Sequence, residues 1–196
     1  MTMPTLPLVL ASTSPYRRLQ LEQLGLAFEA VAPGVDEEAL GVGAVSPDEL
    51  ALRLARAKAE AVRLVRPTAL VLGADQVVAL GEARLGKPGS RARAIEQLLH
   101  MQGRTHELVT GVAVLGPGFV HEQVVVTRMT MRALSREQVE RYVELDQPWD
   151  CAGAYKFEAH GPLLFERVET EDPTAILGLP LLTVVRALAA AGWTLP

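Results

Sequence analysis

The residues at positions 12–18, Ser-Thr-Ser-Pro-Tyr-Arg-Arg, bring hydroxyl and guanidinium groups to the start of a predicted helix. Ser14 can cap this helix with Pro15 in its first turn, which leaves free backbone N–H groups and the positive end of the helix dipole facing outward. With Ser12 and Arg17 beside it, such a helix start favours an anionic ligand, phosphate above all. Taken alone, the segment fits an ordinary capped helix with a solvated arginine pair equally well.

The chain has only three lysines against sixteen arginines, so each lysine invites a specific explanation. Lys58 falls on the apolar stripe of a predicted helix, where an amine needs an anionic partner, although its stem could also carry it to the surface. Lys87 lies in the tight loop Gly86-Lys87-Pro88, where an exposed loop lysine is the ordinary explanation. Both are candidate phosphate ligands, and the role of Lys156 is left open.

Three carboxylates are placed where they could bind a metal or activate water. Asp75 follows the buried run 70–74, at the predicted end of a strand, the position where α/β proteins hold ligands and catalytic groups. Asp36 and Glu37, in an acidic loop, could bind magnesium with Asp75, because this cation takes few carboxylates and shares the phosphate oxygens of a substrate. The competing explanations are a turn-forming aspartate and a solvated acidic loop.

Cations for a polyphosphate, a helix N-terminus and carboxylates for a metal and for water together suit hydrolysis of a phosphoanhydride. The chain lacks the phosphate loop G-x-x-x-x-G-K-[ST] and the dinucleotide motif G-x-G-x-x-G. Its four histidines show no metal-ligand spacing, and no G-x-S-x-G segment predicts a serine nucleophile. Cys151 is the only cysteine, which excludes an intramolecular disulfide, and we expect it to be a small buried hydrophobic residue.

Length and charge limit the classes of function. A chain of 196 residues, 49% of them hydrophobic, predicts one domain, residues 1–196, with a substantial core. The net charge of −4 argues against a nucleic-acid polymer as partner, because proteins that bind such polymers usually carry a basic face. Residues 1–11 lack the basic start of a signal peptide, and no apolar run reaches the length of a membrane span. We therefore expect a soluble cytoplasmic protein.

The predicted strands and helices alternate in an order that would position these residues. A β-α-β opening, hairpins in the middle of the chain and a closing helix predict an α/β fold with a mixed sheet flanked by helices. A hairpin turn is predicted at Gly81-Glu82, and capping boxes at Ser46 and Ser135 mark two helix starts. The predicted strands are Leu6–Ala11, Phe28–Ala32, Ala69–Gly73, Glu107–Leu115, Phe119–Met131 and Leu163–Val168. The predicted helices begin at Pro15, Pro47, Ser90 and Ser135, and a last one ends near Ala190.

These motifs, in this order and over nearly the whole chain, resemble those of the Maf family of nucleoside triphosphate pyrophosphatases. The matching residues are Ser12, Ser14, Arg17, Asp36-Glu37, Lys58, Asp75, Gly86-Lys87-Pro88, Thr110-Gly111 and Cys151-Ala152-Gly153. The resemblance implies a twisted, two-lobed sheet like that of the inosine triphosphate pyrophosphatases, a Maf/Ham1-like fold. It also implies a homodimer.

The resemblance further implies hydrolysis of a nucleoside triphosphate to its monophosphate and pyrophosphate, with a divalent cation, Mg²⁺ or Mn²⁺. In that reaction Asp75 is the catalytic residue that activates water. Glu37 and Asp75 are the implied metal ligands. The implied phosphate-binding residues are Ser12, Ser14, Arg17, Lys58 and Lys87.

Three positions distinguish branches of this family, and here they are Tyr16, Gln76 and Glu158. They differ from the Arg, Thr and Gln expected of the branch that cleaves dTTP and UTP, and they resemble the 7-methyl-GTP branch. N7-methylation gives guanine a positive charge, which an aromatic face and a carboxylate both favour, although the tyrosine here replaces an expected tryptophan. We therefore expect a 7-methyl-GTP pyrophosphatase that sanitises the nucleotide pool. The alternatives are a dTTP/UTP pyrophosphatase and a non-catalytic nucleotide-binding regulator of cell division.

Overall fold

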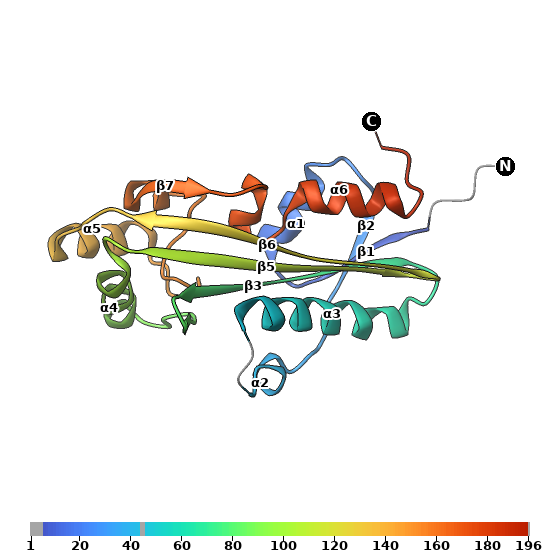
Figure 1. The fold of residues 1–196 in the computed structure, drawn as a ribbon, viewed down its shortest axis with the longest axis horizontal. Coiled ribbons are helices and arrows are strands. Elements are labelled where there is room, and N and C mark those ends of the chain that lie inside the picture. Colours follow the sequence, from blue (N-terminus) through green and yellow to red (C-terminus); the bar gives the residue numbers. More distant parts are fainter. Residues whose placement is uncertain (1–5, 44–45, 196) are drawn as a thin grey trace. The chain divides into compact units, whose positions relative to one another are not determined.

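The computed structural model describes residues 6–43 and 46–195 and has an α/β fold (Figure 1). The described strands form a mixed seven-stranded sheet in the order β2-β1-β3-β5-β6-β7, with β4 paired to β3. The strands are β1 (Leu8–Ala11), β2 (Phe28–Val31), β3 (Leu70–Leu80), β4 (Ala83–Leu85), β5 (Thr105–Gly116), β6 (Phe119–Met131) and β7 (Phe165–Glu169). The α-helices are α1 (Pro15–Glu22), α2 (Glu37–Leu40), α3 (Pro47–Val65), α4 (Arg91–Met101), α5 (Arg136–Asp146) and α6 (Leu181–Ala190), and the 3-10 helices are η1 (Gly161–Leu164) and η2 (Pro173–Leu177). The predicted fold class, a mixed sheet flanked by helices, is confirmed.

The chain divides into two compact units. The first unit comprises Met1–Gln76, Thr110–Val125 and Asp172–Pro196, and the second comprises Val77–Val109 and Val126–Glu171. Strands β3, β5 and β6 each contain residues of both units. That residues 1–196 form a single domain stays a prediction.

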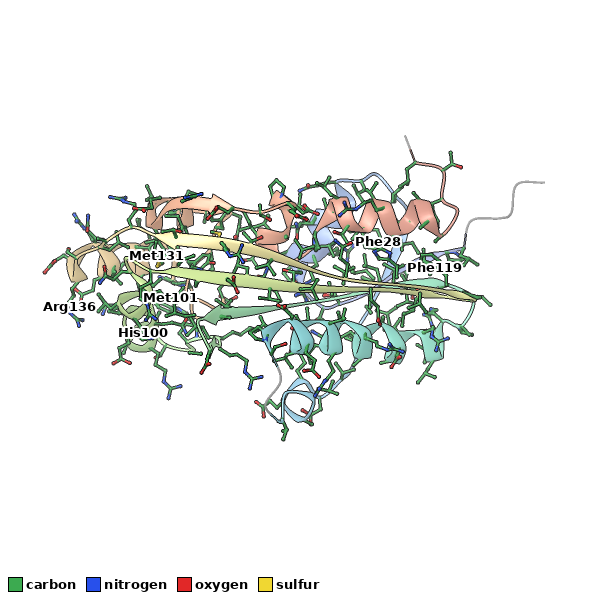
Figure 2. All side chains as sticks on the ribbon, in the orientation of Figure 1. Phe28, His100, Met101, Phe119, Met131 and Arg136 are labelled. Carbon is green, nitrogen blue, oxygen red and sulfur yellow. The ribbon has the colours of Figure 1, made fainter. Side chains whose placement is uncertain are left out.

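In the first unit, the side chains of successive strand residues alternate between the two faces of the sheet and form two cores. On one face, Leu72 of β3 packs among apolar residues of α1 and α6. On the other face, Val71 packs among alanines and Val62 of α3. Figure 1 shows α6 and α3 on opposite sides of the strands, and Figure 2 shows Phe28 and Phe119, which pack against the first core, on the α6 side.

Helix α3 lies close to the sheet because the strands beneath it carry glycines. A Cβ atom placed on Gly73 of β3 would lie 2.2 Å from the carbonyl oxygen of Ala55, and one placed on Gly111 of β5 would lie 2.3 Å from that of Ala51. Because Gly73 and Gly111 have no side chain, the backbone of α3 packs directly on the sheet at these two positions. The close approach also sets the height of Lys58, on the next turn of α3, above the strands.

Replacing Gly73 with alanine is expected to lower the free energy of unfolding by about 1–3 kcal/mol or more, because the new methyl group would overlap the backbone of α3. The midpoint of urea denaturation measures the loss. Gly86→Ala is the matched control, since a Cβ atom there meets nothing within 4 Å. Equal stability of the two variants would contradict the packing of α3 on β3.

Serine side chains cap four of the helices at their N-termini, and they are Ser14, Ser46, Ser90 and Ser135. At α5 the cap is a full capping box with Gln138, as predicted. At α3 the cap accepts from the backbone N–H of Glu49, whose carboxylate pairs with Arg53. These four helix starts were therefore predictable from the sequence, because each cap satisfies a backbone donor that the helix leaves unpaired.

The second unit has a core of its own, built around aromatic rings. His106 of β5 is buried, and its Nε2 atom lies 2.9 Å from the hydroxyl of Tyr155. The ring centroid of Phe165 lies 5.7 Å from that of His106 and 4.9 Å from that of Tyr155. Met101 of α4 and Met131 of β6, labelled in Figure 2, are buried in the same unit. Burial lowers the pKa of His106 to about 4.

The buried His106 is expected to make stability depend on pH. Its pKa is about 4 in the folded protein against 6.5 when exposed, so between these values the unfolded chain binds the proton more tightly. This contribution is present above pH 6.5 and is lost as the pH falls toward 4, by up to about 3 kcal/mol.

Urea denaturation at a series of pH values between about 7.5 and 4.5 tests this dependence. His106→Gln should lose the part of the pH slope that His106 causes. His100→Gln, at an exposed position, is the control and should keep it. The same slope in His106→Gln as in the unaltered protein would contradict the buried neutral histidine.

Some element boundaries differ from the prediction. Strand β3 continues to Leu80 instead of ending at Gly73, and its hairpin with β4 turns at Gly81-Glu82 as predicted. The acidic loop contains the short helix α2, and the last strand begins at Phe165, after η1. Two parts of the chain lie outside the described residues. They are residues 44–45, in the predicted loop, and residues 1–5, which belong to the N-terminal segment that was compared with signal peptides. Among the described helices, none is long and apolar enough to cross a membrane.

Candidate active site

Three charged side chains of the first unit meet at one point. The Nζ atom of Lys58 on α3 lies 2.5 Å from Oδ1 of Asp75 on β3 and 2.7 Å from Oε1 of Glu37 on α2. Lys58 and Asp75 are buried, with 5% and 7% of their surfaces exposed, whereas the Glu37 side chain is 55% exposed. Lys58 therefore stays in the interior with carboxylate partners instead of reaching solvent along its stem.

Asp75 has one oxygen engaged and one available. Oδ1 accepts the hydrogen bond from Lys58, and among the residues that the structure describes Oδ2 has no hydrogen-bond partner. The side chain is 10% exposed. The ammonium group fixes the orientation of the carboxylate, and the second oxygen can accept a proton from water or bind a cation.

Asp75 lies inside β3, so the prediction that it ends a strand is wrong. The parallel strand β1 pairs with Leu70–Leu72 of β3, which leaves Asp75 and Gln76 beyond the carboxyl end of β1. That edge is where open α/β sheets place their ligands. Strand β3 continues through these two polar residues because Lys58 and Thr110 satisfy their side chains.

The chain that leaves β1 leads directly into the N-terminus of α1. Ser12 is buried, and its Oγ atom accepts the backbone N–H of Ser14 at 3.1 Å. The Oγ atom of Ser14 accepts the backbone N–H of Arg17 at 3.4 Å. Both hydroxyls hold the turn as acceptors, and each keeps its own O–H for donation to an anion. Tyr16, in the first turn of α1, is half-buried.

Arg17 brings a second cation to the two carboxylates. Its Nε atom donates to the carbonyl oxygen of Gly178 at 2.9 Å, which anchors the side chain to the segment after η2. Burial lowers the pKa of the Arg17 guanidinium, and the negative charges of Asp75 and Glu37 act in the opposite direction. Arginine stays protonated in proteins, so the cluster holds two cations, Arg17 and Lys58, and two carboxylates.

The donor set of Glu37 and Asp75 fits a divalent cation. Both carboxylates face the same ammonium group, and Mg²⁺ binds through one or two carboxylates together with the phosphates of a substrate. Within residues 6–43 and 46–195, no group of three or more His, Cys, Asp or Glu side chains is arranged to hold a metal. Asp36, the third candidate, caps α2 by accepting from the backbone N–H of Ala39 at 3.0 Å. Metal binding by Glu37 and Asp75 stays a prediction.

Gln76 points to the opposite face of the sheet from Asp75, because successive strand residues alternate. Its Nε2 atom donates to Oγ1 of Thr110 at 2.9 Å and to the carbonyl oxygen of Ala175 at 2.8 Å. Thr110, on β5, is fully buried, and Ala175 belongs to η2. In the sequence, Thr110 was recognisable only as part of the motif Thr110-Gly111. A threonine directly before Gly111, inside an apolar strand, was the signal for a buried polar contact.

Lys87 lies in the second unit and is exposed. Its loop is anchored on both sides. The Gln97 side chain donates to the carbonyl oxygen of Gly86 at 3.2 Å. The backbone N–H of Gly89 donates to the carbonyl oxygen of Trp149 at 2.9 Å. The loop is therefore held while the lysine points to solvent, and phosphate binding by Lys87 stays a prediction.

Glu158 is exposed in a turn of the second unit, and α5 holds both ends of this turn. The hydroxyl of Tyr142 accepts the backbone N–H of Lys156 at 2.9 Å. The carboxylate of Asp146 accepts the backbone N–H of His160 at 3.2 Å and lies 2.5 Å from the ring atom Nδ1. The turn is thus built on a helix, and the role of Glu158 in specificity stays a prediction.

Cys151 was predicted to be buried, but in the structure it is only half-buried. Burial and the nearby charge of Asp150 raise the pKa of the Cys151 thiol to about 12. The thiol therefore stays protonated at neutral pH and is no nucleophile. The Nζ atom of Lys156 lies 3.8 Å from Oδ1 of Asp150, which gives this lysine a surface partner within the second unit.

The model of the family described as Maf-like protein matches residues 7–191. The chain belongs to the Maf family. This Maf chain is 50% identical over 195 residues to a protein of Alkalilimnicola ehrlichii named 7-methyl-GTP pyrophosphatase, with 96% of this chain and 95% of that protein covered. Proteins of the same name from Pseudomonas putida and Bdellovibrio bacteriovorus are 46% and 43% identical, with 97% and 96% of this chain and 100% and 99% of theirs covered. The family expected from the motifs is confirmed.

Among solved structures, the Ham1 protein of Staphylococcus aureus is similar to this Maf chain, with a TM-score of 0.50. The two sequences are 14% identical, and the match covers 92% of this chain and 97% of the Ham1 chain. A likeness at this identity shows the fold alone. The similarity to the Ham1 protein confirms the predicted Maf/Ham1-like fold.

Proposed function

We propose that this Maf protein is a nucleoside triphosphate pyrophosphatase that hydrolyses 7-methyl-GTP to 7-methyl-GMP and pyrophosphate. Relatives named 7-methyl-GTP pyrophosphatase, 43–50% identical over nearly the whole chain, support the substrate. The observation that carries the chemistry is the buried Lys58–Asp75–Glu37 cluster, with Arg17 beside it. It combines cations for a polyphosphate with a carboxylate that can activate water.

In the proposed reaction, Oδ2 of Asp75 accepts a proton from water while the water oxygen forms a bond to the α-phosphorus. The bond from that phosphorus to the oxygen shared with the β-phosphorus breaks, and pyrophosphate leaves with this oxygen. Lys58 orients Asp75 through Oδ1. Its ammonium has three donors, of which Asp75 and Glu37 use two, so one is left for a phosphate oxygen.

The remaining phosphate contacts are assigned to the other cations and to the helix start. Arg17, Ser12, Ser14 and the backbone N–H groups at the N-terminus of α1 bind phosphate oxygens, because charge-assisted hydrogen bonds and the helix dipole both favour an anion there. Lys87 is assigned the same role on the strength of the family resemblance.

Glu37 and Asp75 would hold the divalent cation, Mg²⁺ or Mn²⁺, which when bound would neutralise charge on the phosphates. A carboxylate oxygen that binds a metal tightly cannot also take up a proton. We therefore assign Glu37, whose side chain is 55% exposed, as the principal metal ligand and keep Oδ2 of Asp75 as the base.

Recognition of the base is assigned to Tyr16, Gln76 and Glu158. This assignment rests on the family resemblance and on chemistry: an aromatic ring such as that of Tyr16 and a carboxylate such as that of Glu158 both favour the positive charge of methylated guanine. Gln76 offers hydrogen bonding next to the catalytic residue in the chain. Arg, Thr and Gln, the residues expected at these positions in the branch that cleaves dTTP and UTP, offer neither an aromatic ring nor a negative charge.

The test is a panel of 7-methyl-GTP, GTP, UTP, dTTP and CTP, each with magnesium or manganese, in which pyrophosphate and orthophosphate are scored separately. We expect pyrophosphate, with the highest kcat/KM for 7-methyl-GTP and no turnover in excess chelator. A preference for UTP or dTTP would place the protein in the other branch. Binding without turnover would make it a nucleotide-binding regulator.

The proposal includes a homodimer in the cytoplasm. A single cysteine suits a reducing compartment, and the family resemblance implies the dimer. Light scattering on the purified protein measures the mass directly. The mass of one chain at working concentrations would contradict the dimer.

A further inference from the structure

The side-chain amide of Gln76 is held in one orientation. Both hydrogens of Nε2 are used, one by Oγ1 of Thr110 at 2.9 Å and one by the carbonyl oxygen of Ala175 at 2.8 Å. A carbonyl oxygen can only accept, so the amide nitrogen, and not the amide oxygen, must face Ala175. Oε1 is left as an acceptor, and within the described part of the chain it has no hydrogen-bond partner.

The contact with Thr110 makes this orientation stiff. Thr110 is fully buried on β5, and a β-branched side chain in a strand has little freedom about χ1. Rotation of the amide by half a turn would set two acceptors, Oε1 of Gln76 and the oxygen of Ala175, against each other and cost a hydrogen bond. A glutamine exposed on a surface could present either its oxygen or its nitrogen to a ligand, whereas Gln76 presents the oxygen alone.

Gln76 borders the same end of the sheet as Asp75. The two residues are neighbours in β3, beyond the carboxyl end of β1, and their side chains lie on opposite faces. Arg17 connects the two faces, because it contacts Gly178, three residues after Ala175, and its charge interacts with that of Asp75. A nucleotide whose phosphates are held by Arg17 can therefore extend past the edge of β3 toward Gln76.

We propose that Thr110 is a positioning residue for recognition of the base: the carbonyl of Ala175 sets the orientation of the Gln76 amide, and Thr110 holds the amide in the place where Oε1 meets the nucleotide. This inference rests on the proposed function. A fixed acceptor selects a base with an N–H donor at that point and rejects a base without one, because the site's own polar group is then left unpaired. Of the donors of 7-methylguanine, the 2-amino group is the one that hypoxanthine lacks. The proposal commits the contact of Oε1 to this 2-amino group, and a pair of nucleotides that differ only there tests it.

The experiment compares 7-methyl-GTP with 7-methyl-ITP, the same methylated nucleotide without the 2-amino group. The readout is the ratio of their kcat/KM values in the unaltered enzyme, in Thr110→Val and in Thr110→Ser. One hydrogen bond corresponds to about a tenfold preference for 7-methyl-GTP in the unaltered enzyme. Thr110→Val leaves the amide held by Ala175 alone, so the ratio should fall toward one, and Thr110→Ser, which keeps the hydroxyl, should retain the preference.

Thr127→Val is the matched control, because Thr127 is also a fully buried strand threonine and its hydroxyl donates to Thr170 at 2.9 Å. A structural loss alone lowers kcat/KM for both nucleotides and leaves their ratio unchanged. A ratio in Thr110→Val equal to that of the unaltered enzyme, or a ratio of one in the unaltered enzyme, would overturn the inference alone. Absence of pyrophosphate release from 7-methyl-GTP by the unaltered enzyme would overturn the proposed function as well.

Discussion

An Asp75→Asn enzyme is expected to release pyrophosphate from 7-methyl-GTP about 10²- to 10⁴-fold more slowly than the unaltered protein, because an amide cannot take up the proton of the attacking water. The fold should persist. Lys58 keeps Glu37 as a partner at 2.7 Å, and the amide oxygen of the new asparagine can still accept from it. Steady-state rates over a range of nucleotide concentrations measure kcat and KM, and the effect should fall on kcat and leave KM nearly unchanged.

Asp36→Asn is the matched control for this substitution. Asp36 caps α2, and asparagine caps a helix as well as aspartate does, so this variant should stay within a few-fold of the unaltered rate. Unchanged turnover in Asp75→Asn would refute the base. A rise in KM with kcat unchanged would instead make Asp75 a binding residue.

Replacing Lys58 with methionine is expected to cost both stability and activity. The change leaves Asp75 buried without the ammonium group that bonds to its Oδ1 atom, and removal of one partner from a buried ion pair costs about 3–5 kcal/mol. Turnover should fall about 10²- to 10³-fold, the usual effect of removing one group that stabilises developing charge. Urea denaturation and pyrophosphate release measure the two effects on the same preparation.

A second substitution separates these two effects. Lys58→Met combined with Asp75→Leu removes both charges, so the stability should recover while the activity stays lost. Arg56→Met, on the exposed side of the same helix, is the control and should cost much less, because its ion pairs with Glu60 and Glu122 lie at the surface and such pairs contribute little. A Lys58→Met variant as stable as Arg56→Met would show that the buried pair contributes nothing to the fold.

The sequence was most informative where one residue satisfies a local physical requirement. The serine caps at Ser14 and Ser135 and the turn at Gly81-Glu82 were predicted, because a helix start and a hairpin each need particular side chains at fixed positions. Lys58 was predicted to have an anionic partner because it interrupts an apolar stripe, and its bond to Asp75 shows that partner.

The sequence was least informative where distant residues supply the missing contact. Asp75 and Gln76 read as the end of a strand, because nothing nearby in the chain satisfies two polar side chains inside a sheet. Their partners are on α3, on β5 and in η2, and only the folded chain brings them together. The anchoring of Arg17 by Gly178 has the same origin.

Close packing was also missed, although it left a trace in the sequence. Alanines spaced by four residues, Ala51 and Ala55, lie on the face of α3 that contacts the sheet, and Gly111 and Gly73 lie beneath them. Small residues on both surfaces indicate a close approach, but the pairing of a particular glycine with a particular alanine depends on strand register, which the sequence did not determine.

In the proposed reaction, Asp75 activates water for attack on the α-phosphorus of 7-methyl-GTP. A single turnover in water labelled with heavy oxygen, followed by mass spectrometry of both products, tests it most directly. We expect the label in 7-methyl-GMP, none in pyrophosphate, and a rate of labelling that falls with Asp75→Asn. Label in pyrophosphate, or labelling of 7-methyl-GMP at an unchanged rate by Asp75→Asn, would contradict it.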